Sequence, residues 1–158
     1  MHFCPNCLDW VDTEVRKVTE TYPVRGENIT IEANVRFCKK CNDDLFDETL
    51  DTENLNRAYD IYRQNHKVIP ASAIFRIRNS YSLSQVAFSR ILGFSDGKIK
   101  SLENGSLPTI AESNLLFLVQ DSENFSQILE LNRTLIEKDE YEAARYALGT
   151  IWVERNKN

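Results

Sequence analysis

The chain has 158 residues, and its hydrophobic content of 42% is ordinary for a globular protein, with room for one medium-sized domain or two small ones. No run of about 18 apolar residues occurs, and the short polar start does not resemble a secretory signal, so we expect a cytoplasmic protein with no membrane span. The net charge of −5 argues at first sight against nucleic acid as a partner.

All the cysteines of the chain lie in its first quarter, as two Cys-x-x-Cys pairs. Two thiolates three positions apart on a tight turn can bind one metal ion together, and two such turns complete a tetrahedral site with no open position. The spacing therefore predicts one structural zinc ion, bound by Cys4, Cys7, Cys38 and Cys41. A closed site of this kind stabilises a fold and does no chemistry on substrates.

Other uses of the cysteines are weaker interpretations. Two disulfides would suit a secreted protein, and a thioredoxin-like redox pair would leave the second pair unexplained. His2 and His66 are not needed as ligands when four thiolates are available. Since no Ser/His/Asp or Cys/His arrangement exists, we expect no enzymatic activity.

Between the two cysteine pairs the pattern favours a small antiparallel β-ribbon. Residues 11–22 alternate roughly, residues 29–37 alternate cleanly between apolar and polar, and Pro23 and residues 26–28 interrupt the two runs. A helix is expected from Asp51 or Thr52, either of which can cap it, to about residue 65. Its apolar face would consist of Leu55, Ala58, Tyr59 and Tyr62. Residues 66–70 are interpreted as the connection between two domains, 1–66 and 67–158.

The second domain is expected to be wholly helical. A first helix ends near residues 79–80, a second spans 85–92 with Ser84 as its cap, and a third spans 96–103 with Ser95 as its cap. Thr109 and Glu112 form a capping box for a fourth helix through residues 115–119, an apolar run that we expect in the core. Two further helices are expected at about 122–136 and up to about 154. The fold class is therefore α+β.

The last of these helices carries a stripe of Tyr141, Ala144, Leu148, Ile151 and Trp152. Such a stripe usually packs within its own chain. Aromatic anchors such as Tyr141 and Trp152 also suit a dimer interface, so both interpretations remain open.

Charge is distributed unevenly along the chain. Residues 1–66 hold 8 basic and 13 acidic groups, residues 67–107 hold 6 and 2, and residues 108–158 hold 5 and 9. The second and third helices of the helical domain form a helix-turn-helix, and this motif is the one basic island. A local positive surface is what contact with DNA phosphates requires.

Geometry assigns roles within this motif. The start of a recognition helix lies near the base edges in the major groove, and the preceding helix can meet a phosphate. The expected DNA-binding residues are Ser84, Gln85, Ser95, Asp96, Lys98, Lys100 and Ser101. Gly97 lies inside the expected third helix, where a glycine is unusual because it costs about 1 kcal/mol relative to alanine.

The elements Leu83-Ser84-Gln85, Leu92-Gly93-Phe94-Ser95 and Glu103-Asn104-Gly105 resemble the XRE or Cro/C1-type helix-turn-helix. With two cysteine pairs ahead of such a domain, residues 1 to about 120 resemble the MqsA (YgiT-type zinc finger) antitoxin family. The resemblance implies a homodimeric antitoxin whose zinc domain neutralises a toxin encoded beside it. It further implies that the helical domain represses the operon at a palindromic operator in double-stranded DNA.

Two departures limit the resemblance. The reading helix has Gly97, Lys98 and Lys100 where the family often has Asn and Arg, and the segment beyond residue 122 is longer than in a minimal member. The alternative is a stand-alone transcription regulator whose zinc site is structural or senses metal, without a toxin partner.

Overall fold

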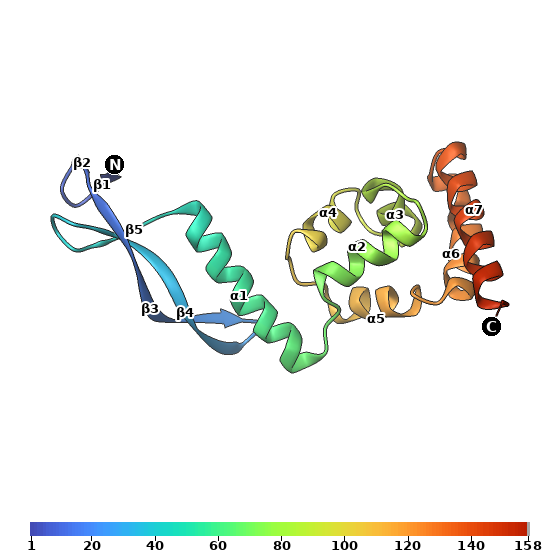
Figure 1. The fold of residues 1–158 in the computed structure, drawn as a ribbon, viewed down its shortest axis with the longest axis horizontal. Helices are drawn as coiled ribbons and strands as arrows, with labels where there is room; N and C mark the ends of the chain where they lie inside the picture. The colour runs from blue at the N-terminus through green and yellow to red at the C-terminus, as the bar shows by residue number, and fades with distance from the viewer. Residues whose placement is uncertain (158) are drawn as a thin grey trace. The chain divides into compact units, whose positions relative to one another are not determined.

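The structure, a computed structural model, describes residues 1–157, and its contacts divide the chain into two compact units that meet between His66 and Lys67. Small antiparallel sheets lie in the first unit, and six of the seven α-helices of the described residues lie in the second (Figure 1). The predicted α+β class is confirmed. None of the described helices is long and apolar enough to cross a membrane.

The first unit contains two sheets. Strands β1 (His2–Cys4) and β2 (Asp9–Val11) pair with each other, and β3 (Thr13–Val24), β4 (Glu27–Cys38) and β5 (Asp44–Leu45) form a three-stranded sheet in that order. Strands β3 and β4 make a hairpin whose two-residue turn, Arg25 and Gly26, has φ of 50° and 85°. Positive φ at both turn positions matches the right-handed twist of the strands.

Pro23 does not end the strand, contrary to the sequence prediction. It lies inside β3, opposite Asn28. The other edge of β3 pairs with no strand, so the missing N–H of proline costs no ladder hydrogen bond there.

The clean alternation predicted for the second long strand is confirmed. Ile29, Ile31, Ala33 and Val35 of β4 are buried, and helix α1 (Glu48–His66) contacts this strand. The helix begins earlier than predicted, because Asp47 rather than Asp51 or Thr52 accepts the first N–H groups, those of Thr49 and Leu50. Hydrogen bonds from Arg36 and from the Leu50 N–H lower the pKa of the Asp47 carboxyl.

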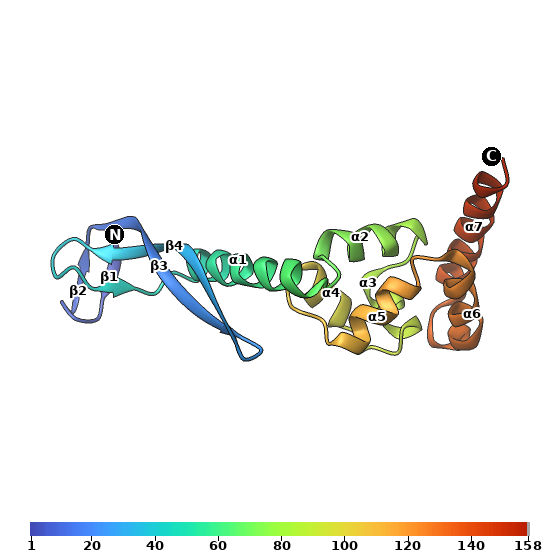
Figure 2. The same cartoon turned by 90° about the horizontal axis from the view of Figure 1, so that it is seen from below.

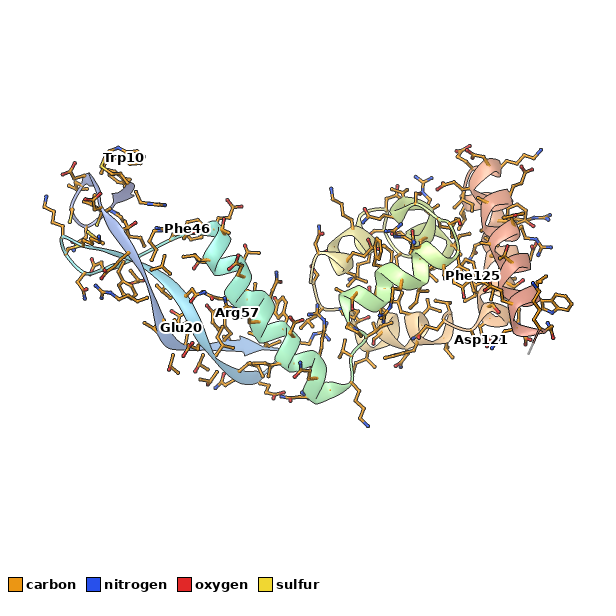
Figure 3. All side chains as sticks on the ribbon, in the orientation of Figure 1. Trp10, Glu20, Phe46, Arg57, Asp121 and Phe125 are labelled. Carbon is orange, nitrogen blue, oxygen red and sulfur yellow. The ribbon has the colours of Figure 1, made fainter. Side chains whose placement is uncertain are left out.

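The buried face of α1 is also polar where an apolar face was expected. Leu55 is exposed, whereas Asn54 is fully buried. The Asn54 side chain accepts from the Asn34 N–H at 3.0 Å and donates to the Asn34 carbonyl at 2.9 Å. Arg57, labelled in Figure 3, donates to the carbonyl of Glu32 at 3.1 Å. Because β5 pairs with only two residues of β4, these side chains satisfy backbone groups at an open strand edge.

The second unit consists of helices alone in the described residues. They are α2 (Ala71–Ser80), α3 (Gln85–Ile91), α4 (Lys98–Glu103), α5 (Ile110–Leu118), α6 (Ser122–Asn132), a 3-10 turn η1 (Arg133–Leu135) and α7 (Lys138–Arg155). Ser84 caps α3, and Thr109 with Glu112 forms the predicted capping box of α5. Gly93 and Gly105, with φ of 74° and 110°, end α3 and α4 as expected.

One continuous core joins all these helices. Tyr81 stacks on Phe125 with ring centroids 3.8 Å apart, and the Tyr81 hydroxyl donates to the carbonyl of Val119. Burial raises the pKa of Tyr81 to about 12. Helices α6 and α7 lie side by side (Figure 2), and Phe125 brings α6 into the core.

One expectation about this core was wrong, and the stripe of the last helix divides between its two interpretations. Leu116 and Val119 are buried, but Phe117 and Leu118 of the same run are 45% and 58% exposed, because α5 rests on the core with one face only. Trp152 does not pack with the stripe of the last helix and is 65% exposed, whereas Tyr141, Ala144, Leu148 and Ile151 do contact the core.

Candidate metal centre and candidate nucleic-acid interface

The two Cys-x-x-Cys turns bring their sulfur atoms together. Cys4 ends β1 and Cys38 ends β4, and both are fully buried; Cys7 and Cys41 follow on the turns and are partly exposed. All four sulfur atoms lie within 4.8 Å of one another. No pair forms a disulfide, so the disulfide interpretation is not supported.

The sulfur spacing fits a tetrahedral thiolate site. A Zn–S bond of about 2.3 Å places neighbouring sulfurs of a tetrahedron about 3.8 Å apart. The Cys4 and Cys41 sulfurs are 3.5 Å apart, and those of Cys7 and Cys38 are 3.9 Å apart. Four cysteines in this arrangement could hold a metal ion such as zinc.

Backbone N–H groups surround the sulfurs. The N–H of Cys7 donates to Cys4 Sγ at 3.4 Å, and those of Lys40 and Cys41 donate to Cys38 Sγ at 3.3 and 3.4 Å. Burial opposes ionisation of Cys38, but these donors lower its pKa to about 7. Burial and the neighbouring thiols raise the pKa of Cys7 to about 12. Four thiolates this close repel one another unless a cation lies between them, and these N–H donors stabilise sulfurs that bind one.

The surroundings of the cluster explain why it matters to the fold. Among the described residues, the other buried apolar side chains packed with it are Val11 and Leu45. The residues after each turn, Leu8 and Asn42, have positive φ of 52° and 64°. A local core this small cannot by itself order the ends of three strands and two turns.

In the second unit, α3 and α4 form the predicted helix-turn-helix. The buried Ser89 hydroxyl donates to the carbonyl of Gln85 and accepts from the N–H of Ile99, which ties the two helices together. Ile91, Ile99 and Leu102 complete the packing between them. The role of Ser89 was not predicted, and its only sequence signal is a serine at a position of α3 that otherwise faces the core.

The start of the second helix of the motif differs from the prediction. Helix α4 begins at Lys98, and Ser95 caps nothing with its side chain, although its carbonyl accepts from the Lys98 N–H at 2.9 Å. Gly97 is therefore the residue before the helix and not an interior glycine. A Cβ at Gly97 would meet no atom within 4 Å, so this position is open to solvent.

An ion pair links α2 to the helix-turn-helix. The Arg78 guanidinium donates to both carboxylate oxygens of Glu103, at 2.6 and 3.0 Å, and to the carbonyl of Leu83. The Gln85 amide donates to Glu103 at 2.7 Å. The Arg78 and Glu103 side chains are 13% and 7% exposed. Gln85, expected at a phosphate, thus has an internal partner in this structure.

Other expected DNA-binding residues also have partners within the unit. Asp96 accepts two hydrogen bonds from Arg90, and Lys98 lies 3.0 Å from Glu112. Ser84 caps α3 with its hydroxyl, while its N–H donates to Glu140 of α7, so a carboxylate already lies at this helix start.

Lys100 and Ser101 remain on the exposed side of α4. The Ser101 hydroxyl contacts that of Ser106 at 2.6 Å. Three of the six basic side chains counted in this region, Arg78, Arg90 and Lys98, are neutralised by carboxylates. Asp96 and Glu103 are the two acidic groups already in the count, so it is Glu112, from outside residues 67–107, that makes the positive surface smaller than the sequence count indicates.

No family model matches the chain, and no curated protein matches it significantly.

Proposed function

We propose that this protein is an antitoxin that binds DNA through α3 and α4, represses its own operon as a homodimer and neutralises a toxin through its metal-stapled first unit. The observation that carries the DNA-binding part is the exposed side of the helix-turn-helix. Ser95, Gly97, Lys100 and Ser101 all lie there, outside the core. A lysine flanked by small residues suits close approach to a phosphate or to a guanine edge.

The charge distribution favours a two-fold complex on DNA. One protomer offers a reduced positive surface, so one motif alone would bind weakly. Two motifs on a palindromic operator double the number of contacts, with half-sites about one helical turn apart, roughly 34 to 36 Å.

Replacing Lys100 by Ala should weaken binding to the operator at least about tenfold, as expected for the loss of one contact in each of two half-sites. Lys98→Ala should weaken it less, because Lys98 already pairs with Glu112. The measurement is a fluorescence-anisotropy titration with DNA from upstream of the gene, at several salt concentrations. Lys17→Ala, which removes the same charge from the first unit, is the matched control. Equal affinity of the Lys100 and Lys17 variants for the operator would refute DNA binding through the exposed side of α4.

The antitoxin part is supported by the surface of the first unit, which is acidic and carries exposed aromatic side chains. Trp10 is 64% exposed and Phe46 81% exposed (Figure 3). Trp10 also lines a groove of about 320 Å³ together with two acidic and two basic side chains, those of Asp9, Asp12, Lys39 and Lys40. Exposed aromatic side chains are typical anchors of protein interfaces. The excess of acidic groups in residues 1–66, 13 against 8 basic ones, suits a basic, RNA-degrading partner.

Co-expression with the adjacent gene tests the antitoxin part. We expect the wild-type chain to restore growth and to co-purify with the product of that gene, and Trp10→Ala to reduce recovery of the complex at least about tenfold, as for an interface hot spot. Leu131→Ala, at an equally exposed apolar residue of α6, is the control. If the product of the adjacent gene is not toxic and does not co-purify, the antitoxin part is refuted and the alternative is a stand-alone transcription regulator. That alternative predicts operator binding without any protein partner.

A further inference from the structure

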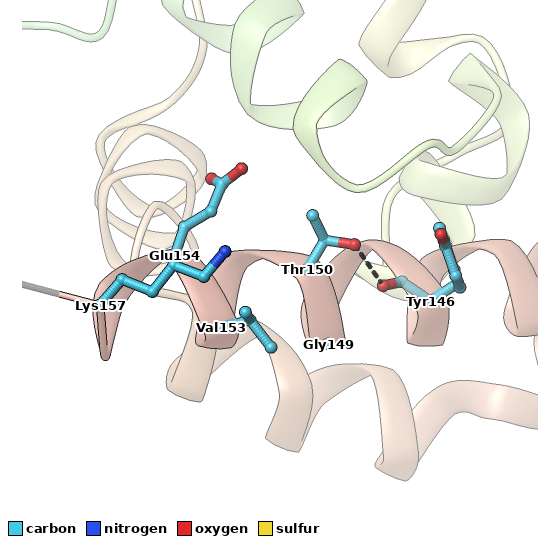
Figure 4. A pocket seen from close by; sticks show the side chains of 6 residues that line it. All are labelled: Tyr146, Gly149, Thr150, Val153, Glu154 and Lys157. Carbon is cyan, nitrogen blue, oxygen red and sulfur yellow. Dashed lines mark hydrogen bonds between the residues drawn. The ribbon is translucent and has the colours of Figure 1, made fainter.

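Helix α7 has two faces of different character. Ala144, Ala147 and Leu148 are buried on one side. On the other side Tyr146 is 82% exposed and Val153 44% exposed, on either side of Gly149. With Thr150, Glu154 and Lys157 they line an open groove of about 510 Å³ (Figure 4). Neither Tyr146 nor Val153 is among the side chains of the described residues that pack on the core of the unit.

The spacing of the outer face is that of a helix-pairing seam. Glu142, Tyr146, Gly149 and Val153 follow one another at intervals of four, three and four residues. Residues at these intervals form one stripe along a helix, as in the contact seam of a coiled coil. Since a seam needs a second helix, its pattern points to another helical surface as the occupant.

Gly149 supports close approach of that second helix. A glycine inside a helix costs about 1 kcal/mol relative to alanine. Its φ is not positive, and a Cβ there would meet no atom within 4 Å, so nothing within this chain requires glycine at this position. A missing side chain at the centre of the stripe lets a neighbouring backbone come near.

The charges along the stripe are self-complementary in one direction only. Glu142 lies toward the start of α7, where it forms an exposed pair with Lys138 at 3.7 Å, and Lys157 lies just beyond the end of the helix. When two copies cross antiparallel about a two-fold axis at Gly149 and Thr150, Tyr146 faces Val153 of the second copy and Glu142 faces its Lys157. A parallel pair would place Glu142 against Glu142. Antiparallel helices also align their dipoles favourably.

We infer that the outer face of α7 is a homodimerisation surface on which a second copy of this chain packs its own α7 antiparallel, centred on Gly149. The inference locates the contact between protomers, and it does not depend on DNA binding or on a toxin. It also accounts for the part of the chain beyond residue 122. One helix pair buries less area than a standard interface, so the dimer should form reversibly with concentration.

A charge swap tests the direction of pairing. Sedimentation velocity of the metal-loaded full chain over a wide concentration range should show a monomer–dimer equilibrium. Glu142→Lys alone and Lys157→Glu alone should each weaken the dimer about fivefold or more, because an attractive pair becomes repulsive twice per dimer. The double variant should return to the wild-type dissociation constant. A monomeric wild type, or a double variant no better than the single ones, would overturn the inference.

A second variant tests the close approach. Gly149→Gln should leave the helical content of the monomer unchanged or higher, since glutamine favours helix and the space is open, but it should abolish the dimer. Leu131→Gln, at an exposed leucine of α6, should leave the dimer intact. A dimer that persists in Gly149→Gln, or is lost equally in Leu131→Gln, would place the contact elsewhere. No DNA is present, so this outcome is separate from that of the operator titration.

Discussion

Removal of bound metal should unfold residues 1–66 and leave the helical unit folded. The cysteine cluster is packed with only Val11 and Leu45, so the turns and the ends of β1, β4 and β5 have little other than the metal to order them. The rest of the unit buries two alanines and a few branched side chains between β4 and α1. Ligand binding and folding are coupled in such modules, with apparent binding free energies of about 10 to 16 kcal/mol for structural zinc. The free energy lost with the ion therefore exceeds the stability that this small core supplies.

Hydrogen exchange of the full chain before and after chelation measures the effect by region. Amides of β3, β4 and α1 should lose protection, while those of α2, α3 and α5 keep it. Cys4→Ser, at a fully buried sulfur, should reproduce the chelated pattern. His2→Ala is the matched control, because His2 lies beside the cluster in sequence but contacts Thr13 instead. Continued protection of β3 and β4 without metal would refute a structural role for the site.

The local elements of the fold were the most predictable. Alternation in residues 29–37 and the capping residues Ser84, Thr109 and Glu112 depend on short-range geometry, which the sequence alone displays. The spacing of the cysteines likewise predicted the cluster, since a turn of four residues leaves few other places for two thiols. The two helices of the helix-turn-helix were predicted from Gly93 and Gly105, which end α3 and α4 at positive φ.

Errors arose where a long-range contact decided between local alternatives. Asp47 caps α1 in place of Asp51 because Arg36, on a distant strand, holds its carboxylate at 2.7 Å. Pro23 stays in β3 because the edge beside it has no partner strand, a property of the sheet. Helix α4 starts at Lys98 because the Ser95 carbonyl, and not its side chain, accepts the first hydrogen bond.

The charge of the candidate DNA-binding surface was overestimated for the same reason. A count over residues 67–107 includes Asp96 and Glu103 but no carboxylate from another part of the chain. Arg78 and Lys98 have carboxylate partners from α4 and α5, of which Glu112 lies outside the counted segment. The charge counted in one segment of a sequence thus overestimates a positive surface whenever the fold brings a carboxylate from another segment beside it, as α5 does here with Glu112.

The largely buried ion pair between α2 and α4 should be essential to the stability of the second unit. Glu103→Ala leaves the Arg78 guanidinium, 13% exposed, without its carboxylate. Breaking a buried pair by removing one partner costs about 3 to 5 kcal/mol, because the remaining charge is desolvated and uncompensated. For a unit of this size each kcal/mol lowers the midpoint of thermal unfolding by about 4 to 8 °C, so we expect a fall of at least about 12 °C.

A double variant separates charge burial from loss of packing. Arg78→Met with Glu103→Leu removes both charges and keeps similar volumes, and such replacements are often neutral or stabilising. It should therefore recover most of the stability that Glu103→Ala loses, as followed by calorimetry of the metal-loaded chain.

In the double variant Gln85 loses its partner at Glu103, and its amide becomes free to contact DNA. If the ion pair also positions Gln85 for contact with DNA, the double variant will be stable and yet bind the operator with altered affinity. Equal destabilisation of the single and double variants would show that shape, and not charge pairing, is what the motif requires at this position.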